Sequence, residues 1–145
     1  MKIIAVDPGL TSGVAIYNNG LITTKTLALD KEEIGLFMQK NKSCKIWVVE
    51  KPIAYSPLAG DVCMCEGYWY ASIDHLADKD ADIYNQYPKQ RVSHQKLAEK
   101  MTRNPHESDA LAHLLKYLDK NYPTEYNMII HPLKEEISEQ TTISN

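Results

Sequence analysis

The first seventeen residues place the strongest constraint on the fold, because an apolar run ends in an acid and a second apolar run follows a bend. The run Ile3–Val6 is apolar at every position, which is typical of a strand buried on both faces. Pro8 and Gly9 end this strand. Asp7 therefore lies at the carboxyl end of a central strand, where a charge is costly unless it meets a cation. We interpret Asp7 as the first ligand of a metal site; an aspartate that only forms a turn is the alternative.

The same pattern returns at residues 45–50, where an apolar run ends in Glu50 before a Lys-Pro pair. Between the two runs, the Asn-Asn-Gly segment 18–20 predicts a hairpin, and Asp30 begins a helix with a capping box. A helical connection favours a parallel strand beside the first one. Asp7 and Glu50 would then end neighbouring strands, at the edge where ligands bind in open α/β sheets.

The remaining pattern predicts further helices and one more strand around this sheet. We expect one folded domain over residues 1–120 and a partly flexible extension over residues 121–145, where the periodicity fades after a Tyr-Pro pair. The fold class is therefore α/β. The expected later elements are a helix over 62–77 capped by Asp61, a strand over 81–87, a helix over 94–101 capped by Ser93, and a helix over 105–119 capped by Asn104.

Composition excludes several classes of protein. The 145 residues fit one domain, and no apolar run approaches the ~20 residues of a membrane span. We find no signal-peptide pattern, and three cysteines without a disulfide-like spacing are typical of a reducing cytoplasm, so we expect a cytoplasmic protein. The net charge of −3 argues mildly against nucleic-acid binding, although basic residues cluster in the segment 89–103.

A third acid stands out in the last predicted helix. Asp109 lies one turn into it, beside small residues that permit close packing on a sheet, and shares a helix face with His106 and His113. If this helix docks beside the two strand ends, Asp7, Glu50 and Asp109 meet. Three carboxylates in one place repel one another unless cations are present, and oxygen ligands suit Mg²⁺ or Mn²⁺. Two such ions ~3.5–4 Å apart form the clamp used to hydrolyse phosphodiesters.

Three segments, Ile4–Gly9, Val48–Glu50 and His106–Ala112, give the chain a resemblance to a known family. Together they resemble the RuvC family of Holliday junction resolvases, in the ribonuclease-H-like superfamily. The resemblance covers Met1 to Leu118 in order and spacing. It implies a five-stranded mixed β-sheet flanked by helices and a homodimer. It also implies a Mg²⁺-dependent nuclease activity on branched DNA: the enzyme cuts a four-way junction by two symmetric nicks.

The resemblance also implies roles for individual residues. Asp7 would bridge two Mg²⁺ ions, for which Mn²⁺ substitutes, Glu50 would bind the ion on the leaving-group side, and Asp109 the ion that holds the attacking water. The fourth ligand falls at His106, where the better-known residue of the family is aspartate. We favour His106 because it shares the helix face of Asp109, and Glu107 is the alternative.

Candidate DNA contacts are less specific. Tyr55, in the loop after the second acid, is a candidate for insertion into the junction. An aromatic triplet, residues 68–70, is expected to pack on the sheet or at a dimer interface, with base stacking as the alternative. Four basic residues are candidate phosphate contacts, with a solvated face as the alternative: Lys51, Lys89, Arg91 and Lys96.

Three other functions compete with junction resolution. The first is a ribonuclease-H-like nuclease that processes RNA or other branched or flap DNA. The second is a nucleotide-binding domain like those of sugar kinases and actin, whose phosphate loop also reads Asp-x-Gly-x-Thr, as residues 7–11 do. That class needs two such domains, and this chain has neither the length nor the repeat. The third is a junction-binding protein without activity, which would not require clustered acids.

Overall fold

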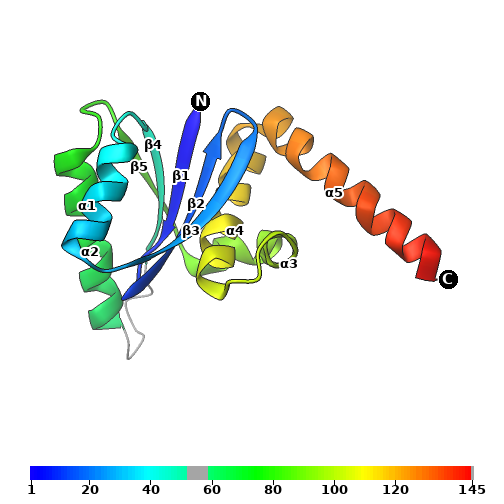
Figure 1. Ribbon diagram of the computed structural model, residues 1–145, viewed down its shortest axis with the longest axis horizontal. Helices are drawn as coiled ribbons and strands as arrows, with labels where there is room; N and C mark the ends of the chain where they lie inside the picture. Colours follow the sequence, from blue (N-terminus) through cyan, green and yellow to red (C-terminus); the bar gives the residue numbers. More distant parts are fainter. Residues whose placement is uncertain (52–58, 145) are drawn as a thin grey trace.

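The computed structural model describes residues 1–51 and 59–144, and its centre is a five-stranded mixed sheet of order β3-β2-β1-β4-β5 (Figure 1). Strand β2 is antiparallel to both β1 and β3, whereas β4 is parallel to β1 and β5 is parallel to β4. The expected parallel pairing of the two acid-ended strands is therefore confirmed. The strands are β1 (Lys2–Asp7), β2 (Thr11–Asn18), β3 (Leu21–Ala28), β4 (Ile46–Glu50) and β5 (Asp82–Gln86).

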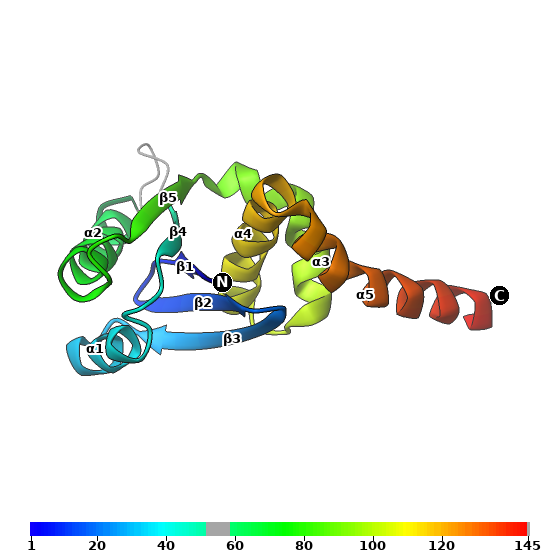
Figure 2. The ribbon, with the colours of Figure 1, turned by 90° about the horizontal axis from the view of Figure 1, so that it is seen from above.

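Helices cover both faces of the sheet, as the two ribbon views show (Figures 1 and 2). On one face, α1 and α2 pack against the sheet, and α3 and α4 cover the other. The last helix, α5, extends away from this domain. The helices are α1 (Lys31–Lys40), α2 (Ala59–Leu76), the 3-10 turn η1 (Pro88–Arg91), α3 (Val92–Met101), α4 (Pro105–Asn121) and α5 (Pro123–Ser144).

Side-chain alternation along the central strands decides which layer each acid faces. In β1, Ile3 and Ala5 belong to the core under α4, whereas Ile4 and Val6 belong to the core under α1 and α2. Because the side chains of a strand alternate, Asp7 continues the row that faces α4. In β4, Val48 packs under α4, so Glu50, two residues on, follows the same rule. Both acids therefore end their strands on the face that α4 covers.

Helix α4 docks closely on this face because small residues line the contact. Its buried apolar side is the one expected from the sequence, and it begins at Asn104, whose side chain accepts hydrogen bonds from the first turn. At Gly13 in β2, a Cβ atom would lie 1.8 Å from the carbonyl oxygen of His106. Only glycine permits this approach. The buried apolar residues of α4 are Ala110, Leu111, Ala112, Leu114, Leu115, Tyr117 and Leu118.

Helix α2 buries the middle residue of the aromatic triplet. The Trp69 side chain is fully buried, its indole N–H donates to Oγ of Ser12 at 3.0 Å, and its ring packs edge-on against Phe37 at 6.1 Å. Packing on the sheet, rather than base stacking, is therefore the role of this residue. Helix α2 begins before Asp61, so the predicted cap at that position was wrong. Likewise, α3 begins at Val92, and Ser93 lies within it.

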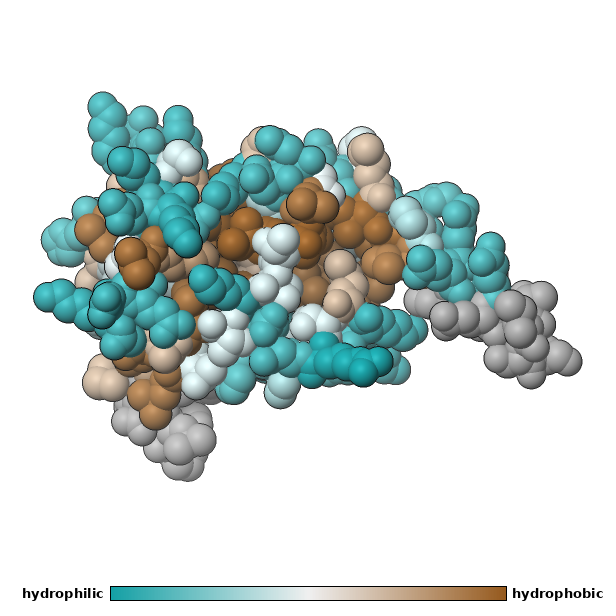
Figure 3. Space-filling model, in the orientation of Figure 1, coloured by the Kyte–Doolittle hydropathy of each residue, from teal (hydrophilic) through white to brown (hydrophobic). Residues whose placement is uncertain are grey.

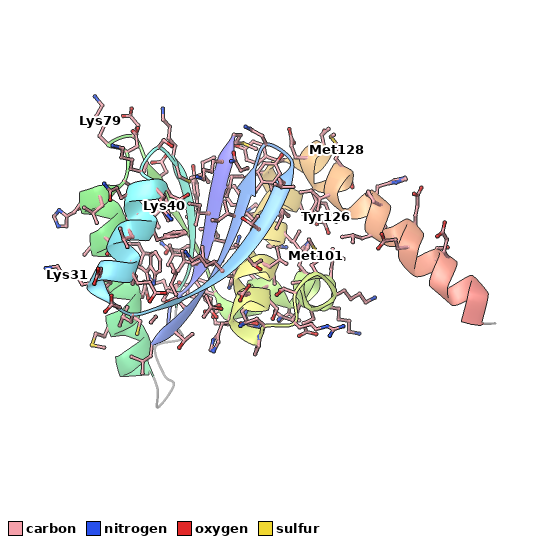
Figure 4. The ribbon with its side chains drawn as sticks, in the orientation of Figure 1. Lys31, Lys40, Lys79, Met101, Tyr126 and Met128 are labelled. Atoms are coloured by element: carbon pink, nitrogen blue, oxygen red, sulfur yellow. The ribbon has the colours of Figure 1, made fainter. Side chains whose placement is uncertain are left out.

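The C-terminal segment differs from the sequence-based expectation, because residues 123–144 form one helix. At its beginning this helix packs on the domain: Tyr126 and Ile129 adjoin the core under α4, and Ile130 is buried. Hydrophobic residues gather on this face of the molecule, where Met101 and Tyr126 lie (Figures 3 and 4). Beyond these turns the apolar periodicity is weak, which is why the helix was not predicted. Among the described residues, no helix is long and apolar enough to cross a membrane.

Candidate active site

Asp7, at the end of β1, has the most strongly altered acidity of the described acids. Burial of the carboxyl group, together with the nearby charges of Glu50 and Asp109, raises the pKa of Asp7 from its ordinary 3.8 to about 8. The protonated Asp7 carboxyl donates a hydrogen bond to the Glu50 carboxylate. The strand-end acid is thus a buried group whose negative charge is poorly compensated by the protein.

Glu50, at the end of β4, is the most heavily hydrogen-bonded of these acids. It is 9% exposed, Nε2–H of His113 donates to its Oε2 at 2.7 Å, and Nε of Arg91 lies 3.4 Å from the same oxygen. Burial alone would raise the pKa of Glu50, but the hydrogen bond and charge of His113, with the charge of Arg91, outweigh it and the pKa is lowered. Glu50 is therefore ionised while Asp7 holds the proton.

A buried histidine connects Glu50 with the neighbouring strand. His113 is fully buried, and its Nδ1 lies 2.7 Å from Oε1 of Gln86. Gln86 is the register partner of Glu50 in β5. Helical spacing had placed His113 on the face of Asp109, which was the available signal for it. Nothing in the sequence marked Gln86, because its place depends on the pairing of β4 with β5.

Asp109, in the second turn of α4, faces the same cluster. Its Oδ1 accepts a hydrogen bond from Nε2 of Gln95 at 2.8 Å and lies 3.6 Å from Nη1 of Arg91. Arg91 therefore lies between Glu50 and Asp109, and it is only about a quarter exposed. We had expected Arg91 to contact phosphate. In the structure its guanidinium lies within 3.6 Å of both Glu50 and Asp109.

The two candidates for the fourth ligand have different surroundings. His106 is exposed in the first turn of α4, above Gly13, which is the register partner of Asp7. Glu107 instead faces β3: its two carboxylate oxygens accept hydrogen bonds from the hydroxyls of Thr24 at 2.6 Å and Thr26 at 2.7 Å. This side chain therefore attaches α4 to the sheet.

The candidate DNA contacts are spread over the rim of the cluster. Lys51, Lys89 and Lys96 are all exposed. Lys51 directly follows β4, and its backbone N–H donates to the carbonyl of Gln86 at 2.7 Å. Tyr55 lies outside the described residues. The structure thus leaves the lysines available to solvent, and their role in binding DNA stays a prediction.

The acids of the cluster fit a divalent cation in their chemistry, although not in their present side-chain arrangement. Carboxylates are the hard oxygen donors that such a cation prefers. A cation would also stabilise the ionised form of Asp7, whose pKa is raised without one. Yet, across residues 1–51 and 59–144, no three His, Cys, Asp or Glu side chains are arranged to hold one ion. The carboxylates of Glu50 and Asp109 are instead directed at protein partners: both lie near Arg91, and Asp109 also accepts a hydrogen bond from Gln95. A bound ion would take the place of Arg91 and of the proton on Asp7.

Comparison with known proteins identifies the fold. No family model and no curated protein matches the sequence. Among solved structures, RuvC of T. thermophilus in complex with Holliday junction substrate superposes with a TM-score of 0.59 at 16% identity, over 83% of this chain and 97% of that one. The chain has a RuvC-like fold. The ribonuclease-H-like architecture expected from the sequence is thereby confirmed.

A second solved structure, the Fowlpox virus resolvase with its substrate Holliday junction DNA, gives a TM-score of 0.49 at 14% identity, over 84% of this chain and 99% of that one. At sequence identities this low, structural similarity indicates a shared fold and does not establish a shared activity. The acids of this chain have defined positions within the RuvC-like fold. Two of them end adjacent parallel strands, and the third lies on the helix that crosses those strand ends.

Proposed function

We propose that the protein is a divalent-metal-dependent endonuclease that cuts branched DNA, with the four-way junction as its substrate. One observation carries the proposal: Asp7, Glu50 and Asp109, which are far apart in the sequence, meet at the carboxyl edge of a RuvC-like sheet, where Arg91 lies within 3.6 Å of Glu50 and Asp109 and the charges of both act on Asp7. Clustered buried carboxylates cost folding energy, and a protein that only binds DNA does not need them. The solved structure of similar fold contains a Holliday junction substrate, which supports this substrate class.

The chain's own residues would prepare the site for two Mg²⁺ or Mn²⁺ ions. We assign Asp7, Glu50 and Asp109 as ligands, with His106 from the first turn of α4 as the fourth. When bound, such ions neutralise phosphate charge and promote attack by water. The protein contributes by holding the ligands in place: His113 orients Glu50 through a 2.7 Å hydrogen bond.

Two further side chains have defined parts in this proposal. Gln95 orients Asp109 through its amide, at 2.8 Å. Arg91, once released from the acids, is placed to contact the phosphate that is cut. The reaction is hydrolysis of a phosphodiester, which leaves a 5′-phosphate and a 3′-hydroxyl. Paired symmetric nicks require two such sites on one junction, so we infer that the working form is a homodimer.

A substrate panel tests this function. The panel contains a four-way junction, a linear duplex, a flap, an RNA–DNA hybrid and a structured RNA, each with Mg²⁺, Mn²⁺ or Ca²⁺. We expect paired nicks in the junction with Mg²⁺ and Mn²⁺. The Asp7→Asn variant should bind the junction and not cut it, whereas Asp74→Asn, the same change at an exposed acid of α2, should cut normally. Unchanged nicking by Asp7→Asn would reject the assignment of the site.

The panel also separates the main alternative. A ribonuclease-H-like nuclease that acts on RNA or on flaps would use the same acids, so Asp7→Asn would inactivate it too. Preferential cutting of the hybrid, the structured RNA or the flap would keep the proposed site and replace the proposed substrate. The two parts of the proposal are thus tested by different arms of one experiment.

A further inference from the structure

A hollow of about 570 Å³ opens on the other side of Gln86 from the candidate active site. It is formed by the end of β5, η1, α3 and α4, and its size falls in the range of ligand-binding pockets. The buried ring of Tyr117 lines it, and the more exposed ring of Tyr84 lies 5.3 Å from that ring. Its lining residues are Tyr84, Asn85, Gln86, Lys89, Gln90, Ser93, Lys116, Tyr117, Lys120 and Asn121.

Positive charge is concentrated around this hollow. Lys116 and Lys120 lie one turn apart on α4, and Lys89 extends from η1. None of these three lysines forms an ion pair with any residue in the described part of the chain. One acid, Asp82, lies close enough for its charge to affect the Tyr117 hydroxyl, but Asp82 does not line the hollow. In a chain of net charge −3, three unpaired ammonium groups around one hollow favour an anion.

The hollow and the acid cluster share one residue. Gln86 lines the hollow, and its side chain contacts Nδ1 of His113, which in turn donates to Glu50. This contact places the lysine-lined hollow next to the His113–Glu50 pair. Gln90 adds an amide NH2 group suited to phosphate oxygens, because its hydrogen bond with the N–H of Tyr87 uses the side-chain oxygen; Ser93 and Asn121 are bonded to His94 and to the carbonyl of Tyr117.

We propose that this hollow binds the phosphodiester backbone of the nucleic acid whose neighbouring phosphate lies at the acid cluster. The inference rests on the proposed function, and it adds a second anchoring site that carries no base specificity. Lysines are point charges that contact phosphate without reading sequence, so the hollow would fix the position of the strand. A free phosphate-bearing small molecule has the same chemistry, and the experiment distinguishes the two sources.

The test measures how junction binding depends on salt. A fluorescently labelled four-way junction is titrated with protein in Ca²⁺ buffer, between 50 and 200 mM salt, by anisotropy. In the hollow variant, Lys116→Gln and Lys120→Gln are combined; in the matched control, Lys40→Gln and Lys79→Gln are combined, two exposed lysines on the side of the molecule where α1 and α2 lie (Figure 4). Glutamine keeps the helix propensity and removes the charge. Circular dichroism confirms that each variant is folded.

We expect the slope of log K against log salt to fall by about 1 per lysine in the hollow variant and to be unchanged in the control. The wild type would then lose roughly tenfold more affinity than the hollow variant over this salt range. Equal effects of the two pairs, or no effect of the hollow pair, would overturn the inference and leave the proposed function standing.

A calorimetric titration with pyrophosphate forms the second arm. If the hollow pair weakens pyrophosphate binding and leaves junction binding unchanged, the hollow takes a small anion and the strand proposal is overturned. Failure of the proposed function gives a different result: the wild-type protein binds none of the nucleic acids, before any variant is compared.

Discussion

At the scale of single residues, Asp7 determines how stability depends on pH. Its pKa in the folded protein is about 8, against an ordinary 3.8, so between these values the folded state holds a proton that the unfolded chain has lost. Without divalent ions, the free energy of unfolding should therefore fall as pH rises through this window. Asp7→Asn cannot ionise and should lack this fall, so at pH 8 it should be more stable than the wild type.

Urea unfolding between pH 5 and 9 in the presence of EDTA measures this difference. Parallel pH profiles for the two proteins would contradict the placement of the proton on Asp7. Addition of millimolar Mg²⁺ gives the converse comparison: at about ten times its Kd the ion should stabilise the wild type by about 1.4 kcal/mol and leave Asp7→Asn unchanged. The exposed Asp74→Asn serves as the control in both series.

His106 and Glu107 are adjacent residues with separable roles. Glu107→Ala removes two hydrogen bonds between α4 and β3 and should lower the free energy of unfolding by about 1–3 kcal/mol, while the Mg²⁺-dependent stabilisation persists. His106→Ala, at an exposed position, should change stability by less than about 0.5 kcal/mol and weaken the response to Mg²⁺. Thermal unfolding with and without the ion measures both. The opposite pattern would make Glu107 the ligand.

At the scale of elements, the approach of α4 to β2 decides whether the acids meet. Gly13→Ala would place a methyl group against the backbone carbonyl of His106, and a backbone atom cannot rotate away. We expect a loss of about 3 kcal/mol or more in the free energy of unfolding, together with a large loss of cutting, because Asp109 moves with α4.

The control for this helix displacement is Gly35→Ala. Gly35 lies within α1, where an added methyl group would meet nothing within 4 Å. This variant should gain about 0.5–1 kcal/mol, since alanine favours the helix. If Gly13→Ala were as stable as the wild type, the close contact between α4 and β2 would be wrong.

The elements that could be predicted from the sequence are those whose own residues show a clear apolar run or a clear helical periodicity. Asp7 and Glu50 were recognised because each ends an apolar run, and Asp109 because helical periodicity is strong around it. Arg91 and Gln86 could not be assigned, since their places depend on strand register and on how η1 leads into α3. Helix α5 was missed for a related reason: most of it lies beyond the core, so burial imposes no pattern on its sequence.

At the scale of the whole molecule, one chain carries one acid cluster, whereas paired nicks need two. The proposed dimer therefore requires a surface, and the groove of about 320 Å³ between α1 and α2 is our candidate, because its exposed lining is almost wholly apolar. Its rim includes Tyr68, the exposed Ala71 and the half-exposed Leu76. A charge placed here should separate the subunits without disturbing either core.

Light scattering should give twice the 16.5 kDa chain mass for the wild type and the single mass for Ala71→Glu. The matched control is Met128→Glu, at a residue of α5 that is 73% exposed and lies on the far side of the molecule from α1 (Figure 4). It should remain dimeric. On a plasmid cruciform, Ala71→Glu should produce single nicks, because one subunit cuts alone, and the wild type and Met128→Glu should produce linear DNA. A monomeric wild type that makes paired symmetric incisions would refute the dimeric mechanism.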